Sequence, residues 1–497
     1  MASHFANGIP PRLYLWQRVR EYAVPPSMIE TATARRAAGD WAGACAAARI
    51  DVDLDLRAVR HRHGTDLTTL LRADLRRLAP DLLRWHMPRI APDGRLRPGL
   101  TLSLARYRAS GPTPLHLVVR TPPAWADAGQ RMSLTLWEGP GTGSPAHHSQ
   151  HPHPPHHPHP HPDRRFRLDL HRHLWDAGRS GELGWRCGAR QASSGAPPLP
   201  VQDVTDGLTT PGSPWAVTRW AAEAELLLRD EGRHRGAFAV RLGARERAAF
   251  ALVAPDDSHV PTLRPLRETA LSPQEVAALP LLPEAAARVL PDLELLRSGL
   301  VTAGRLHPLV AAALPVPASA PVAGPAVEAA DPHRVDCRGE VHRIALRDGV
   351  LTAVDHDPAE LRREELLVAL GGPALPCLRA IDSVHRSPQA LPAVRERLRH
   401  GDVTGALAVV EGLLGPAAVL RDGPLRQELE AAAARRVEHG LFRSGLVAVH
   451  PAAGTGGGRA DGEHTATDHR PRLDRRTPAS MRRKRTGRGR PRTGLAC

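Results

Sequence analysis

The aromatic residues are confined almost entirely to the first half of the chain. All nine tryptophans lie between Trp16 and Trp220, and after Phe250 the only aromatic residue is Phe442. Aromatic side chains bury more surface than most others, so the two halves must build different kinds of core. We predict a first half packed by Trp and aliphatic residues and a second half packed by Leu, Val and Ala. The length of 497 residues predicts two or three domains.

The hydrophobic period changes along the first half. Up to residue 98 the apolar spacing is helical, and from Gly99 it alternates. Four alternating segments, at 100–104, 115–119, 132–136 and 166–170, predict an antiparallel meander. The resulting fold class is α+β, with N-terminal helices, the meander, a helical segment and a smaller helix-rich C-terminal domain with one β-hairpin.

Composition shifts mark the domain boundaries. We expect a helical region at 1–98, a β-rich region at 99–254 with a His/Pro-rich insert at 140–163, a helical region at 255–314, a Pro/Ala linker at 315–332, a hairpin-plus-helix domain at 333–449 and a disordered Arg-rich tail at 450–497. The hairpin is expected to turn at Asp348-Gly349, between strands 341–346 and 350–354.

One short sequence occurs twice. Gly39-Asp40-Trp41-Ala42-Gly43-Ala44 matches Gly401-Asp402-Val403-Thr404-Gly405-Ala406. A left-handed Gly ends one helix and the following Asp caps the next, so each copy predicts the turn of an αα-hairpin. Such hairpins offer surfaces for binding another protein.

Net charge and cysteine usage exclude several classes of protein. The net charge is +15, yet residues 451–497 alone hold 12 Lys+Arg against 4 Asp+Glu, so 12 − 4 = +8 lies in the tail. Five widely spaced cysteines imply reduced thiols and not a disulfide framework. We find no signal peptide and no apolar span, so a soluble, cytoplasmic protein that does not enter a membrane is expected.

The most conspicuous segment is rich in histidine. Eight histidines occur within fifteen residues, at His147, His148, His151, His153, His156, His157, His159 and His161. Neutral imidazoles bind divalent metals, but the interleaved prolines hold the segment extended, and a catalytic site needs fixed ligands. We interpret the segment as a low-complexity insertion with adventitious affinity for divalent metal.

A second set of cysteines and histidines lies in the C-terminal domain. Cys337 and His342, then Cys377 and His385, form a C-x4-H…C-x7-H array. Two thiolates and two imidazoles would suit tetrahedral Zn²⁺, although these spacings are not those of a zinc finger. The alternatives are two buried structural cysteines, or a cysteine nucleophile with His342, His356 or His385 as its base.

No conventional nucleotide or cofactor site is present in the sequence. Asp51, Asp53 and Asp55 resemble the start of a calcium loop, but Leu56 stands where Gly is needed. Lys484 is the only lysine, which excludes a P-loop. We therefore assign no cofactor and no catalytic residue.

The tail carries a cluster of cations, namely Arg482, Arg483, Lys484, Arg485, Arg488, Arg490 and Arg492. Its Arg-Gly-Arg-Pro core, residues 488–491, resembles an AT-hook. The resemblance implies that Arg488 and Arg490 read an A·T minor groove, while residues 482–485 contact phosphates. It covers about eleven residues, and the same charge also predicts non-specific attraction to nucleic acid.

These features favour a non-catalytic adaptor or scaffold that contacts another protein. The absence of a recognisable catalytic motif supports this hypothesis but leaves an enzyme open, because catalytic residues are often dispersed. One alternative is a nucleic-acid-associated protein that acts through its tail. The other is an enzyme of unrecognised class around Cys337, His342 and Cys377. The sequence specifies no oligomeric state.

Overall fold

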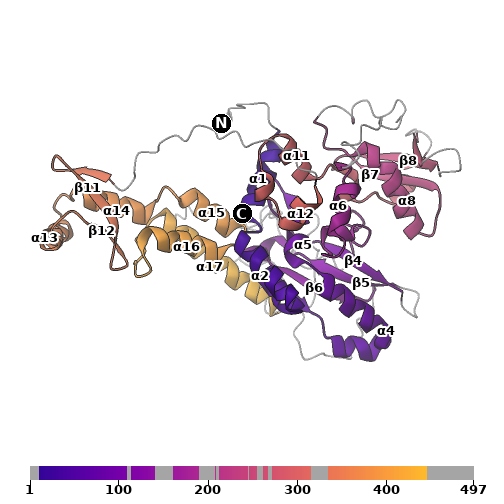
Figure 1. Cartoon of the computed structure of the whole chain (residues 1–497), viewed down its shortest axis with the longest axis horizontal. Helices are drawn as coiled ribbons and strands as arrows, with labels where there is room; N and C mark the ends of the chain where they lie inside the picture. The colour runs from indigo at the N-terminus through magenta and orange to yellow at the C-terminus, as the bar shows by residue number, and fades with distance from the viewer. Residues whose placement is uncertain are drawn as a thin grey trace, which may run out of the picture. The chain divides into compact units, whose positions relative to one another are not determined.

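The chain forms two compact units, shown in a computed structural model (Figure 1). It describes residues 10–108, 114–139, 161–189, 208, 212–244, 246–253, 261–266, 271–314 and 334–444. Unit 1 contains the described residues up to 314, except Ala126–Gln130, which belong to unit 2 together with the described residues from 334 onward. The expected linker at 315–332 and the tail at 450–497 lie outside the described residues.

The main sheet of unit 1 has the order β1-β6-β5-β4. Its strands are β1 (Ile50–Asp53), β4 (Thr101–Tyr107), β5 (Leu115–Arg120) and β6 (Met132–Trp137). The antiparallel meander β4–β5–β6 is the one that the alternation predicts, whereas β1 pairs with β6 in parallel. The segment 166–170 is not a strand, since it forms only an isolated bridge between Ser103 and Arg167.

In the described residues of unit 1, two further sheets and eleven α-helices accompany the main sheet. The strands are β2 (Arg89–Ile90) and β3 (Arg95–Leu96), then β7 (Gly236–Arg241), β8 (Arg247–Val253) and β9 (Thr262–Pro265). The α-helices are α1 (Pro11–Tyr22), α2 (Pro26–Ala37), α3 (Trp41–Ala47), α4 (Leu56–Arg77), α5 (Pro80–His86), α6 (Leu183–Arg186), α8 (Trp220–Asp230), α9 (Pro273–Ala278), α10 (Glu284–Ala287), α11 (Pro291–Arg297) and α12 (Pro308–Ala313).

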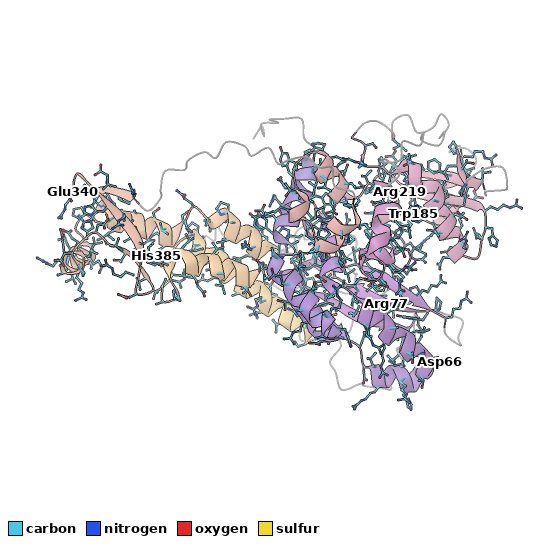
Figure 2. All side chains as sticks on the ribbon, in the orientation of Figure 1. Asp66, Arg77, Trp185, Arg219, Glu340 and His385 are labelled. Carbon is cyan, nitrogen blue, oxygen red and sulfur yellow. The ribbon has the colours of Figure 1, made fainter. Side chains whose placement is uncertain are left out.

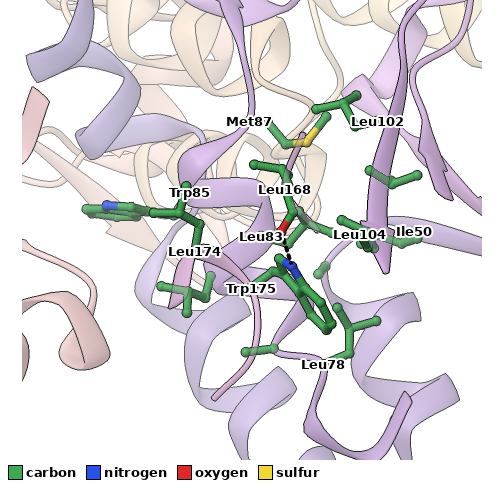
Figure 3. Close-up of a cluster of buried hydrophobic side chains, with 14 of the residues drawn as sticks. Ile50, Leu78, Leu83, Trp85, Met87, Leu102, Leu104, Leu168, Leu174 and Trp175 are labelled. Atoms are coloured by element: carbon green, nitrogen blue, oxygen red, sulfur yellow. Dashed lines mark hydrogen bonds between the residues drawn. The ribbon is translucent and has the colours of Figure 1, made fainter. Parts of the chain in front are cut away.

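Tryptophan and aliphatic side chains fill the core of unit 1, as the composition predicts. Trp85 and Trp175 are buried among leucines and Met87 (Figure 3). The Trp175 indole N–H donates to the carbonyl of Leu168 at 3.0 Å, which satisfies its polar edge within the core. A second core forms around Trp220, Phe238 and Phe250.

In the part of unit 2 from residue 334 to 444, a three-stranded antiparallel sheet is joined to five α-helices (Figure 1). The strands are β10 (Arg334–Cys337), β11 (Glu340–Arg347) and β12 (Val350–Ala353), and the helices are α13 (Pro358–Ala369), α14 (Pro376–Arg386), α15 (Leu391–Arg399), α16 (Val403–Leu414) and α17 (Pro424–Arg443). The predicted hairpin is β11–β12, and Asp348 and Gly349 turn it with φ of 54° and 77°. Its core cluster consists of aliphatic side chains and two cysteines.

The duplicated Gly-Asp sequence forms the same turn in both units. Gly39 and Gly401 have φ of 77° and 81°, and each follows a helix. The Asp402 carboxylate accepts the backbone N–H of Gly405 at 3.1 Å and caps α16, as Asp40 caps α3. The αα-hairpin prediction is therefore confirmed.

These elements confirm the α+β class. In the part of the chain that the structure describes, no helix combines the length and apolarity that a membrane crossing requires.

Candidate metal centre

Three buried side chains converge in unit 2, from parts of the sequence about 20 residues apart. Cys337 ends β10, His356 follows β12, and Cys377 lies in the first turn of α14. Their ligand atoms, two thiol sulfurs and an imidazole nitrogen, all lie within 4.8 Å of one another. The three segments therefore meet at one point in the interior of unit 2.

Local backbone geometry explains how each side chain arrives there. Arg338 and Gly339 form a two-residue turn with φ of 57° and 85°, so Cys337 stands at the end of its strand opposite Glu340. Pro376 occupies the first position of α14, where its fixed φ suits a helix start, and Cys377 follows directly. The sheet and α14 pack together and bring the thiols into contact.

A second histidine lies against this cluster. The ring of His342, on β11, stacks on the ring of His356 with centroids 4.1 Å apart and planes 12° from parallel. His342 Nδ1 and His356 Nε2 are both buried and have no hydrogen-bond partner in the described structure. An unsatisfied buried polar atom costs about 1–3 kcal/mol, so each nitrogen would gain from a ligand.

Carboxylates lie near the other nitrogen of each ring. His356 Nδ1 is 4.0 Å from Glu360 Oε2, and His342 Nε2 is 3.9 Å from Glu340 Oε2. Metal-binding histidines usually direct their second N–H toward a carboxylate or a carbonyl, which fixes the tautomer. At 3.9 and 4.0 Å these two carboxylates are too far to accept hydrogen bonds from the rings, so they place negative charge near the histidines without fixing the ring orientations.

The electrostatics of the cluster favour a protonated Cys377 thiol when no cation is bound. Burial, together with the neighbouring Cys337, raises the pKa of the Cys377 thiol to about 12. A thiol that stays protonated is a poor nucleophile, because the thiolate is the reactive form. A divalent metal that binds the two sulfurs would displace their protons, and its positive charge would balance the resulting thiolates.

The donor set suits Zn²⁺. Thiolate and imidazole ligands bind zinc tetrahedrally at about 2.3 Å and 2.0–2.1 Å, which places two sulfurs roughly 3.8 Å apart. Ligand atoms within 4.8 Å of one another are close to that geometry. Cys337, His356 and Cys377 would be three ligands, and His342 is the nearest candidate for the fourth.

The structure places His385 away from this cluster. It lies eight residues after Cys377 on α14, which is about 12 Å along a helix axis, and Figure 2 shows it far along the ribbon from Glu340. Burial lowers the pKa of His385, with Arg421 acting in the same direction. Of the predicted ligands, Cys337 and Cys377 come together, His342 contacts the cluster through its stack on His356, and His385 does not join them.

The sequence predicts His356 only as a base for a cysteine nucleophile and not as a metal ligand. Its position indicates more, because His356 lies two residues after the second strand of the predicted hairpin. The hairpin brings that position back beside the first strand. Spacing rules built on tight Cys-x2-Cys pairs do not detect such a site.

The other predicted site residues lie mostly outside the described residues. These are seven histidines of the insert, from His147 to His159, and the tail residues 482–492. His161 is described and exposed, with its ring 6.0 Å from that of Trp137.

No family model, curated protein or solved structure matches this chain.

Proposed function

We propose that unit 2 is a zinc-stabilised interaction module and that the chain acts as a non-catalytic adaptor. The observation that carries this proposal is the convergence of Cys337, His356 and Cys377 in a buried cluster. The metal would be structural, because a catalytic zinc keeps one open coordination position for water or substrate. His342, which stacks on His356, would complete the coordination sphere after a rotation of its ring.

A bound metal would link the parts of unit 2 that its hydrophobic core holds weakly. The core cluster is aliphatic and includes the small residues Ala353, Ala406 and Ala432. The ligands come from β10, from the segment after β12 and from α14, with β11 contributing His342. Small cores commonly depend on such a metal staple, and its binding energy adds directly to folding.

The exposed end of α13 supports the interaction role. Of this 12-residue helix only Leu361 is buried, while Leu366 and Leu370 next to its end are 65% and 86% exposed. Leu367 and Val368 are exposed as well. Contiguous exposed apolar side chains of this kind mark protein-binding surfaces, and an apolar segment of another protein fits them.

Metal analysis tests the zinc part of the proposal. Residues 147–160 are deleted from all samples, because the histidine insert would otherwise contribute metal of its own. We expect one zinc per chain, loss of that zinc in Cys337→Ser and in Cys377→Ser, and retention in the control His385→Ala. Well-folded protein that holds less than one zinc per chain after exposure to excess zinc would contradict the proposal.

A substitution pair tests the interaction surface. We expect Leu366→Glu with Leu370→Glu to abolish capture of a protein partner at moderate salt, whereas Val437→Glu, an equally exposed position on α17, leaves capture unchanged. Equal capture by both variants would exclude the end of α13. Sedimentation of the purified chain separates self-association from a foreign partner.

The proposal also includes a reducing compartment for the protein and nucleic-acid binding by the tail. The four described cysteines are free thiols, which suits a reducing compartment such as the cytoplasm. Nucleic-acid binding by the tail remains a prediction, and a gel shift with and without residues 451–497 checks it. Binding that survives the deletion would refute the role of the tail.

A further inference from the structure

Unit 1 contains a cavity of about 160 Å³ that is partly open to solvent. Its walls come from α1, the residues after α5, α6 and the stretch from α10 to α11. Most of the lining is apolar, with Phe166, Leu168, Leu174, Leu183, Val289 and Leu290 among its residues. A cavity of roughly this volume holds one benzene-sized molecule in other proteins.

One wall of the cavity is cationic. Arg219 Nη2 donates to the carbonyls of Arg288 at 3.0 Å and Ala286 at 3.4 Å, and Nη1 donates to the carbonyl of Arg186. The Arg288 guanidinium lies 4.5 Å from the centre of the Trp215 ring. Both arginines line the cavity, and the Arg219 side chain contacts the backbone of Arg288 (Arg219 is labelled in Figure 2).

These two arginines differ from the other arginines of the lining. Arg12, Arg20 and Arg167 each form an ion pair with a carboxylate. Within the described part of the chain, neither Arg219 nor Arg288 has a carboxylate within ion-pair distance. Arg219 is half-buried and donates only to backbone carbonyls, so an anion beside it would be stabilised, and the exposed Arg288 would add to the attraction.

The remaining titratable groups add little negative charge. Burial lowers the pKa of His86 and of His173 well below 6.5, so both rings are neutral at pH 7. The lining contains five arginines and only two acids, Glu284 and Glu294. Glu294 pairs with Arg12, and Arg20 and Arg167 pair with acids outside the lining, so the positive charge left at the cavity is that of Arg219 and Arg288.

From this arrangement we propose that the cavity binds a small organic carboxylate with a body about the size of one ring. The carboxylate would pair with Arg219 and Arg288, since guanidinium groups match carboxylate oxygens in charge and geometry. The apolar body would lie against Phe166 and the surrounding leucines. A purely inorganic anion would leave that apolar wall unfilled, and a neutral ring would leave the two cations unpaired.

Binding is measured on the full chain by titration calorimetry and by the thermal shift of unit 1. The probes are benzoate, its neutral isostere benzamide, and inorganic phosphate. We expect benzoate to bind at least about tenfold more tightly than benzamide or phosphate. Only benzoate has both a carboxylate for the arginines and a ring for the apolar lining. Equal binding of benzamide, preferential binding of phosphate, or no benzoate binding at millimolar concentration would overturn the proposal.

Variants locate the site. Arg288 is exposed, so Arg288→Gln should fold normally and weaken benzoate binding about tenfold, whereas Arg229→Gln, which removes an exposed arginine of α8, should leave it unchanged. Ala285→Leu places a larger side chain on the lining and should exclude benzoate without removing any charge. Unchanged binding in both Arg288→Gln and Ala285→Leu would place the ligand elsewhere. None of these results depends on the metal centre of unit 2.

Discussion

The imidazole rings of His342 and His356 lie face to face, 4.1 Å apart. One ring comes from β11 and the other from the segment after β12, so the stack spans the hairpin. Nδ1 of the first ring and Nε2 of the second have no partner in the described structure, but only His356 reaches the two thiols, and His342 contacts the cluster through this stack.

The two histidines should differ in their contribution to metal binding. We expect His356→Ala to weaken Co²⁺ or Zn²⁺ binding by at least about 100-fold, more than the loss of an outer-shell partner usually costs. His342→Ala should retain binding but change the visible spectrum of the Co²⁺ form, because water would replace one nitrogen. A Co²⁺ spectrum identical to that of the wild type would exclude His342 as a ligand.

Removal of the metal should destabilise unit 2 selectively. A ligand that binds only the folded state stabilises it by about 2.7 kcal/mol at a free concentration 100 times its Kd. A strong chelator should therefore lower the melting transition of unit 2 and leave that of unit 1 in place. Calorimetry measures both transitions, and Cys377→Ser, which has lost a ligand, should no longer respond to the chelator.

The Gly-Asp turns make a prediction about glycine at a capping position. A methyl group at Gly405 would lie 2.1 Å from Asp402 Oδ2, and one at Gly43 would lie 2.0 Å from Asp40 Oδ2. Either alanine substitution should displace the cap and cost about 0.5–2 kcal/mol. Gly412→Ala is the matched control, because nothing lies within 4 Å of its added methyl.

The control should change stability in the opposite direction. Gly412 lies inside α16, where alanine is favoured over glycine by roughly 0.8–1 kcal/mol. Urea denaturation of the three variants measures both effects. If Gly405→Ala were as stable as Gly412→Ala, the contact with the capping aspartate would have no energetic role.

A buried ion pair joins the first helix of unit 1 to α11. Arg20 donates to Asp292 through Nε at 2.8 Å and Nη2 at 2.7 Å, and the Trp85 indole donates to the same carboxylate at 3.1 Å. Asp292→Asn leaves a buried cation without its counter-charge, so we expect a loss of about 3–5 kcal/mol. Glu225→Gln, at an exposed pair on α8, should cost less than about 1 kcal/mol in the same measurement.

Buried neutral histidines should make unit 1 sensitive to acid. Burial lowers the pKa of His116 to about 4, below its ordinary value of 6.5. Above pH 6.5 the ring is neutral in both states; as the pH falls from 6.5 to 4, the unfolded chain takes up the proton first and stability decreases. His86 and His173 act in the same direction.

Thermal melts between pH 7.5 and 4.5 measure this dependence. The melting temperature of unit 1 should fall steadily below pH 6.5, and His116→Asn should reduce the slope, because asparagine does not titrate and keeps a polar atom near Ser103. A slope that is the same with and without His116 would show that its ring does not contribute.

The sequence predicts the strands and turns that depend on residues close to one another in the chain. The meander of β4, β5 and β6 follows from alternation, and the β11–β12 hairpin follows from its Asp-Gly turn. Both αα-hairpins follow from a left-handed glycine and a capping aspartate that are adjacent in the chain. Each of these patterns involves residues that are only a few positions apart in the sequence.

Only the tertiary structure decided which distant groups meet. The strand β1 belongs to the main sheet through its parallel pairing with β6, some 80 residues away, and His356 reaches Cys377 because α14 packs on the small sheet. The contact of the Arg219 side chain with the backbone of Arg288 likewise depends on the packing of α8 near α10. Contacts between such distant residues depend on which faces of the helices and sheets pack together, and the spacing of nearby residues in the sequence does not specify this. The sequence by itself therefore determined the local elements and the composition of each core, and packing determined the metal cluster and the cavity.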